Sequence, residues 1–177
     1  MIQRALRIGA VLLAGLELVA GCGSSDRPAE LSLSDVKACE LIPRSDFRKL
    51  HIVPEPQSLD PTPGVNTEGS SCLYLLRNGN SATLSAITNH GIDRWIDVSS
   101  EDARFKDVPR IQGYRTIQVW FTYDTAAPHH TCRLFVDVAD GQSLKVSVGQ
   151  NSEDDPPTCE AARQFAETAM HTLVNNH

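Results

Sequence analysis

Cys22 lies in a sequence context that supports the covalent attachment of a lipid. Residues 18–22, Leu-Val-Ala-Gly-Cys, place an aliphatic residue and small residues before a cysteine, which is the pattern of a lipobox. A basic N-terminal portion precedes an apolar stretch from Ile8 to Leu16, as in an export signal. We therefore expect residues 1–21 to be a cleaved lipoprotein signal peptide and the Cys22 sulfur to carry a lipid.

A transmembrane helix and an ordinary cleaved signal are the alternatives. A membrane-spanning helix needs about 20 apolar residues, and only about a dozen precede Cys22. An ordinary signal does not need a cysteine at the cleavage point. Glu17 lies near the end of the apolar stretch, where an acidic side chain is costly, and we expect it to make export less efficient without preventing it.

The four other cysteines, Cys39, Cys72, Cys132 and Cys159, indicate two disulfides. An even number of cysteines in an exported chain is typical of a disulfide framework. Their wide spacing is unlike the paired cysteines of a zinc or redox site. Three pairings are possible. We expect Cys72–Cys132 to join two strands and Cys39–Cys159 to tie the N-terminal segment to the last helix.

Two clusters near the loops contain residue types that bind metals. His129 and His130 are adjacent, and adjacent side chains point apart in an extended chain, so we expect a solvated loop. Glu153, Asp154 and Asp155 lack the spacing of a calcium-binding EF-hand. We expect these carboxylates to lie at the positive end of the dipole of the following helix.

Asp93 and Asp97 are four residues apart, so a helix would place both carboxylates on one face. Such a pair could serve glycoside hydrolysis. The nearby Ile92, Trp95 and Ile96 favour a simpler interpretation, in which the two aspartates form the solvated side of a short amphipathic helix. Serine hydrolase, phosphate-loop and zinc-protease motifs are absent from the sequence. We predict no catalytic residue, no metal site and no cofactor.

The composition favours one acidic domain on a short tether. The formal net charge is −6 without a basic cluster, which argues against binding to nucleic acid. Residues 22–33 begin with small and polar residues and predict a flexible tether. The remaining residues, 34–177, are enough for a single domain.

The pattern along this domain predicts helices at both ends and strands between them. Leu31 to Leu50 is compatible with a helical segment, and the prolines between His51 and Ser70 indicate a loop. Alternating apolar residues predict strands at residues 72–76, 82–86, 114–122, 132–138 and 144–148. Asn78-Gly79 and Asp140-Gly141 are typical hairpin turns.

The last helix should begin near Thr158, after two prolines. Its apolar stripe comprises Cys159, Ala162, Phe165, Ala166, Ala169 and Leu173. We therefore predict an α+β fold, an antiparallel sheet of about five strands with N- and C-terminal helices packed on one face.

The opposite sheet face should carry Tyr114, Trp120 and Phe135. Exposed together, these aromatic side chains would form a binding patch. The alternative is that the middle helix around Trp95 covers them.

Four segments resemble the motifs of a known family. Residues 38–43, Ala-Cys-Glu-Leu-Ile-Pro, resemble an opening motif PCxLLTP, and residues 71–74, Ser-Cys-Leu-Tyr, are similar to a strand motif CxW. The other segments are Cys132 with residues 136–144, and residues 157–162. Through these motifs the mature chain resembles the actinobacterial lipoprotein family called domain of unknown function 3558.

The resemblance implies an exported, lipid-anchored domain and brings no established activity. Ala38, Ile42 and Tyr74 depart from the family's Pro, Thr and Trp, which changes local capping and core volume but leaves the four cysteines in place. We expect a non-enzymatic binding or accessory domain on the outer face of the cell membrane. Its partner would be a hydrophobic ligand or an envelope protein. The alternatives are an envelope hydrolase using Asp and His residues, and a structural envelope component.

Overall fold

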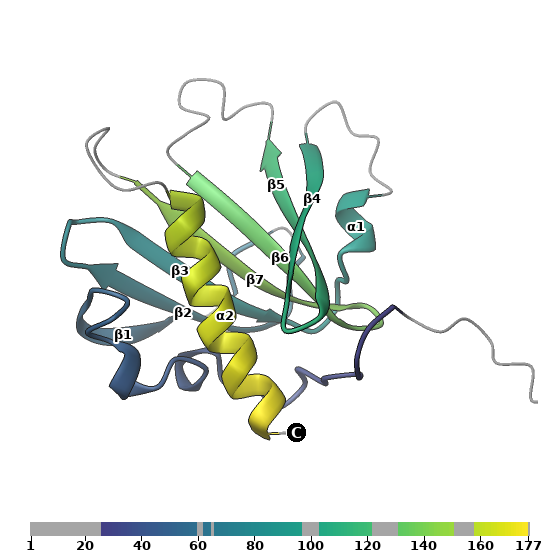
Figure 1. The fold of residues 1–177 in the computed structure, drawn as a ribbon. Coiled ribbons are helices and arrows are strands. Elements are labelled where there is room, and N and C mark those ends of the chain that lie inside the picture. The colour runs from purple at the N-terminus through teal and green to yellow at the C-terminus, as the bar shows by residue number, and fades with distance from the viewer. Residues whose placement is uncertain are drawn as a thin grey trace, which may run out of the picture.

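The fold is a seven-stranded antiparallel sheet with one long helix (Figure 1). The computed structural model describes residues 26–59, 62–64, 66–96, 103–121, 131–150 and 158–176. The strand order is β1-β2-β3-β7-β6-β5-β4. The strands are β1 (Ile52–Leu59), β2 (Gly69–Leu76), β3 (Ser81–Ile87), β4 (Ala103–Ile111), β5 (Tyr114–Phe121), β6 (Thr131–Ala139) and β7 (Gln142–Gly149). The helices are α1 (Asp93–Ile96) and α2 (Thr158–Asn176), and two short 3-10 turns are η1 (Ala38–Glu40) and η2 (Arg44–Asp46).

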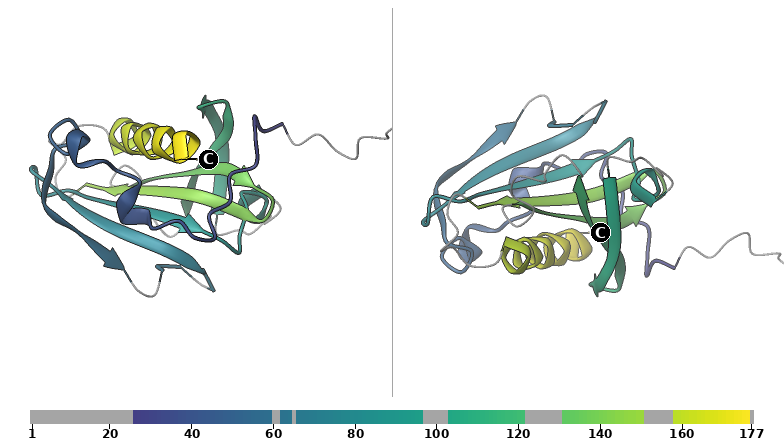
Figure 2. Two further views of the ribbon diagram at one scale, coloured as in Figure 1. Left: turned by 90° about the horizontal axis from the view of Figure 1, so that it is seen from below. Right: turned by 90° about the horizontal axis from the view of Figure 1, so that it is seen from above.

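Helix α2 lies along one face of the curved sheet (Figure 2). Its stripe of Phe165, Ala166 and Ala169 is buried against the inward-facing residues of the central strands, such as Val136 and Val146. The predicted C-terminal helix and its apolar stripe are confirmed. Among the described residues, no helix is long and apolar enough to cross a membrane.

A smaller apolar cluster covers part of the opposite sheet face, under α1. Ile117 and Phe135 are buried there, and the Trp95 ring lies over Phe135 with a centroid separation of 5.0 Å. Apolar residues therefore fill both faces of the sheet around β5 and β6.

The prediction of about five strands misses two, and both are edge strands. β1 contains Pro54 and Pro56, and β4 contains Pro109, in ranges without a clean apolar alternation. Proline has no backbone N–H to donate, so it is tolerated where one side of a strand has no neighbour. Register shifts near these prolines, between Val53 and Gln57 and between Val108 and Ile111, bend both edges.

The N-terminal helix is also corrected. Between Leu31 and Leu50 only η1 and η2 form, each three residues long. The Leu31 N–H donates to the Val138 carbonyl at 2.9 Å, and Leu31 and Leu33 are buried. Residues 26–33, expected to belong to a flexible tether, instead lie against the sheet and form part of the folded domain.

The disulfides join Cys39 to Cys72 and Cys132 to Cys159, so the two expected disulfides form with a different pairing. Cys72 on β2 and Cys132 on β6 are separated by β3 and β7. Three strand spacings amount to roughly 14 Å, whereas disulfide Cα atoms lie within about 7 Å of each other. Each disulfide instead ties one flanking segment to the strand beneath it.

Peptide mapping of the unreduced protein tests this pairing. We expect proteolytic fragments that link Cys39 to Cys72 and Cys132 to Cys159. Replacing either pair with alanine should lower the free energy of unfolding by about 3.5 kcal/mol, because the unfolded chain regains the freedom of a long loop. A fragment linking Cys39 to Cys159 would contradict the structure.

Candidate functional site

A pocket of about 380 Å³ lies between the N-terminal half of α2 and the β2–β3 turn. Pockets for small molecules usually measure about 300–1,000 Å³. The segment that enters β1 forms a third wall, because Leu50 and His51 line the pocket beside Leu76 and Arg77. We call this hollow the helix–hairpin pocket.

The floor of the pocket is apolar. Leu50, Leu76, Val148 and Phe165 contribute to it, and all four are buried in the main core. The Phe165 ring packs against Tyr74 at a centroid distance of 5.5 Å. Because this core is continuous beneath the pocket, the floor is built before any ligand arrives.

The rim is polar and carries both signs of charge. His51 and Arg77 lie on the sheet side, and Glu160 and Gln164 lie on α2. The Arg77 N–H donates to the His51 carbonyl at 2.9 Å. His51 has a left-handed backbone with φ of 56°, an uncommon conformation for a residue with a side chain, which the surrounding fold maintains here.

The Cys132–Cys159 disulfide fixes the helical wall of the pocket. Cys159 belongs to the first turn of α2, and Cys132 pairs in register with Val148 of the pocket floor. The cross-link therefore holds α2 over β6 and β7 at the end where the pocket opens. Such preorganisation lowers the entropic cost of binding. The arrangement suits a ligand with an apolar body and a polar end.

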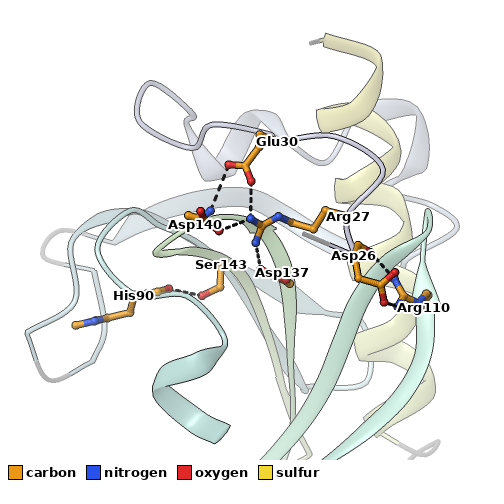
Figure 3. A network of polar contacts seen from close by, with 8 residues as sticks. All are labelled: Asp26, Arg27, Glu30, His90, Arg110, Asp137, Asp140 and Ser143. Carbon is orange, nitrogen blue, oxygen red and sulfur yellow. Dashed lines mark hydrogen bonds and ion pairs between the residues drawn. The ribbon is translucent and has the colours of Figure 1, made fainter. Parts of the chain in front are cut away.

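A second polar site lies at the other end of the sheet, around Arg27 (Figure 3). The Arg27 side chain is only 6% exposed, and its guanidinium donates to Asp137 at 2.8 Å. It also pairs with Glu30 and with Asp140 of the β6–β7 turn. We call these four residues the Arg27 clamp. Their contacts attach the N-terminal segment to the β6–β7 hairpin.

Burial and charge compete within the clamp. Desolvation acts to lower the pKa of Arg27, but its hydrogen bonds to Asp140 and Asp137 outweigh this effect and raise the pKa. Asp137 is affected mainly by burial, which raises its pKa despite the hydrogen bond from Arg27. Arg27 therefore stays fully charged and acts as the centre of the network.

A further ion pair extends this attachment to the β4–β5 hairpin. Arg110 pairs with the Asp26 carboxylate and donates to the Asp26 carbonyl at 2.8 Å. Arg110 also donates to the Gly113 carbonyl, and Arg163 of α2 donates to the Pro109 carbonyl. Two hairpins thus hold residues 26–30 in place.

The predicted aromatic patch does not form. Tyr114 and Phe135 are buried on opposite faces of the sheet, Tyr114 in the main core and Phe135 beneath Trp95. Strand alternation places Trp120, which is half-buried, on the same side of β5 as Tyr114. The middle helix covers Phe135, as in the alternative interpretation. Tyr114 lies by the N-terminal segment. Burial raises the pKa of Tyr114, although the hydrogen bond from the Ala29 N–H and the positive charge of Arg27 act to lower it.

Several residues singled out in the sequence lie outside the described residues. These are Cys22, Asp97, His129, His130, Glu153, Asp154 and Asp155. Asp93 is described and begins α1. Within the described ranges, no three histidine, cysteine or acidic side chains group closely enough to hold a metal ion.

Sequence reasoning missed both the helix–hairpin pocket and the Arg27 clamp. The pocket combines the segment before β1, the β2–β3 hairpin, β7 and α2, which no sequence motif unites. One signal for the clamp was present, because Leu31 and Leu33 alternate with Ser32 and Ser34 as in a segment with one buried side.

The fold and the pocket define a disulfide-linked α+β domain with a ligand-sized hollow beside its long helix. The chain belongs to the family described as "Protein of unknown function (DUF3558)", whose model matches residues 18–172. No curated protein and no solved structure matches the chain.

Replacing Arg27 with alanine tests the energetic importance of the clamp. We expect the free energy of unfolding to fall by about 2 kcal/mol, because the removal of the nearly covered Arg27 side chain breaks its contacts with three carboxylates at once. The matched control is Arg44→Ala, since the Arg44–Glu55 pair is largely exposed at both ends and such pairs contribute about 1 kcal/mol or less. Urea unfolding measures both variants. An equally small loss of unfolding free energy in the two variants would contradict a stabilising role for the Arg27 clamp.

Proposed function

We propose that this protein is a lipid-anchored, extracytoplasmic binding protein that holds a small amphipathic ligand in the helix–hairpin pocket without covalent chemistry. The observation that carries the proposal is the pocket itself, an apolar hollow of about 380 Å³ with a polar rim. Binding sites of this size are largely preformed and combine an apolar lining with a few polar groups.

Lipid attachment at Cys22 is the basis for the location. The lipobox at residues 18–22 and the short apolar stretch before it support export and anchoring at the outer face of the cell membrane. Two disulfides agree with an oxidising, extracytoplasmic environment. Acyl chains would hold the domain at the bilayer by burying their methylene groups.

The side chains of the rim indicate how a ligand would be oriented in the pocket. Arg77 is exposed at the rim, and no ion pair joins it to another residue that the structure describes. An anionic group such as a carboxylate can therefore pair with Arg77, while the apolar body contacts Val148 and Phe165. Gln164, on the opposite wall, offers an amide for a further hydrogen bond.

A bulky side chain in the pocket should abolish this binding. We use anilinonaphthalene sulfonate, an apolar anionic dye, as the probe for the folded mature protein. Ala161 lies in the pocket wall and is half-buried, so Ala161→Trp should remove most of the dye fluorescence and weaken binding at least about tenfold, a change of about 1.4 kcal/mol.

Val174→Trp is the matched control, because Val174 is exposed on the last turn of the same helix, outside the pocket. Gln164→Trp is a second pocket variant, and thermal unfolding confirms that each variant is folded. Dye affinity that is the same in the original protein, both pocket variants and the control would contradict binding in the helix–hairpin pocket.

A further inference from the structure

We infer that the attachment of residues 26–30 to two hairpins, so close to a lipid on Cys22, holds the domain at the membrane in one orientation. It holds the β4–β5 and β6–β7 turns against the headgroups of the bilayer and directs the helix–hairpin pocket away from it. This inference rests on the proposed lipid at Cys22 and on the proposed pocket, and it adds the orientation of the domain and the side from which the ligand arrives.

The covalent reach of the chain limits how far Asp26 can lie from a lipid on Cys22. Asp26, the first described residue, is four residues after Cys22. Four residues span at most roughly 14 Å even when the chain is fully extended. A lipid on Cys22 therefore keeps Asp26 close to the bilayer surface.

Asp26 and Arg27 are attached to two hairpins of the domain. Asp26 pairs with Arg110 of β4, and the buried Arg27 pairs with Asp137 and Asp140 on the β6–β7 hairpin. Figure 3 shows these contacts converging on the N-terminal segment from two hairpins. A segment held from both sides cannot act as a free hinge between the lipid and the sheet.

Close packing at the β4–β5 turn supports the same conclusion. Gly113 has a left-handed backbone with φ of +84°, and a Cβ atom there would lie 2.8 Å from Pro28 Cγ. Only a residue without a side chain allows this approach, so the turn and the N-terminal segment fit against each other. The short reach from Cys22 therefore places the turn near the membrane together with Asp26.

The helix–hairpin pocket lies at the end of the sheet away from the β6–β7 turn. β7 begins beside the β6–β7 turn, and the pocket residue Val148 lies near its other end. The seven residue steps from Gly141 to Val148 span roughly 23 Å at about 3.3 Å per step. The β2–β3 turn and the start of α2 lie at this far end, opposite the N-terminal segment (Figures 1 and 2).

We call residues 26–30 together with the β4–β5 and β6–β7 turns the mounted end. The charge of this end shows what holds it at the membrane. The carboxylates of Asp26, Glu30, Asp137 and Asp140 outnumber the two arginines that they contact. This network of four acidic and two basic side chains has a net charge of −2, so it is not attracted to anionic phospholipids. The lipid and the short tether therefore impose the contact, and a ligand enters the pocket from the aqueous side instead of directly from the supporting bilayer.

Energy transfer from two labelled positions to the bilayer tests the orientation. Lipidated full-length mature protein is reconstituted in phosphatidylcholine–phosphatidylglycerol vesicles that contain a headgroup-labelled acceptor lipid. One dye is attached through Gln112→Cys at the mounted end, and another through Asn78→Cys beside the pocket; both residues are exposed. We expect strong transfer from position 112 and weak transfer from position 78.

A longer tether is the decisive control. Twelve Gly and Ser residues inserted after Ser25 extend the reach by about 20 Å, and the difference between the two positions should be lost. Arg44→Ala, which changes an exposed ion pair between η2 and β1, the edge strand opposite β4, should keep the difference. Equal transfer from both positions in the original protein would overturn the inference.

Two further readouts separate the inference from the proposed function. The soluble Cys22→Ser protein, added to the same vesicles, should show no transfer from either position; persistent transfer would mean that surface affinity holds the domain, against the inference. Failure of the original protein to acquire lipid and sediment with membranes would overturn both the anchor and the inference. Dye binding to the pocket is measured separately on soluble protein, so its loss would contradict only the pocket.

Discussion

The packing of α2 on the sheet, locked by the Cys132–Cys159 disulfide, is the constraint on which the rest of the structure depends. It buries Phe165 and the alanine stripe, which closes the main core on one face. The first turn of the helix is thereby fixed over the end of β7, where the pocket opens. The same interaction thus supplies both stability and a rigid wall for a ligand.

The second constraint acts at the opposite end of the sheet. There the nearly covered Arg27 side chain fixes the N-terminal segment together with the buried Leu31 and Leu33, and its cost of burial is offset by three carboxylates. A disulfide at one end and a charge network at the other divide the molecule into a stable binding end and a mounted end. The distance between the two ends keeps the pocket away from the membrane while the other end lies against it.

The central strands and α2 were predictable because their buried positions repeat with the period of a strand or a helix. The edge strands were not, because β1 and β4 have only one neighbour each and tolerate prolines. The aromatic patch failed for a related reason: β5 is covered on both faces, so its alternation does not reveal an exposed side. The pocket and the Arg27–Asp137 contact, 110 residues apart in sequence, depend on tertiary packing.

Native mass spectrometry of the protein purified from its own cell envelope is the sharpest test of a ligand in the helix–hairpin pocket. We expect a reproducible additional mass of a small amphipathic molecule that is lost on denaturation and is absent from the Ala161→Trp variant. The bare mass of the disulfide-bonded protein, or an additional mass that the variant retains, would contradict a ligand in the helix–hairpin pocket.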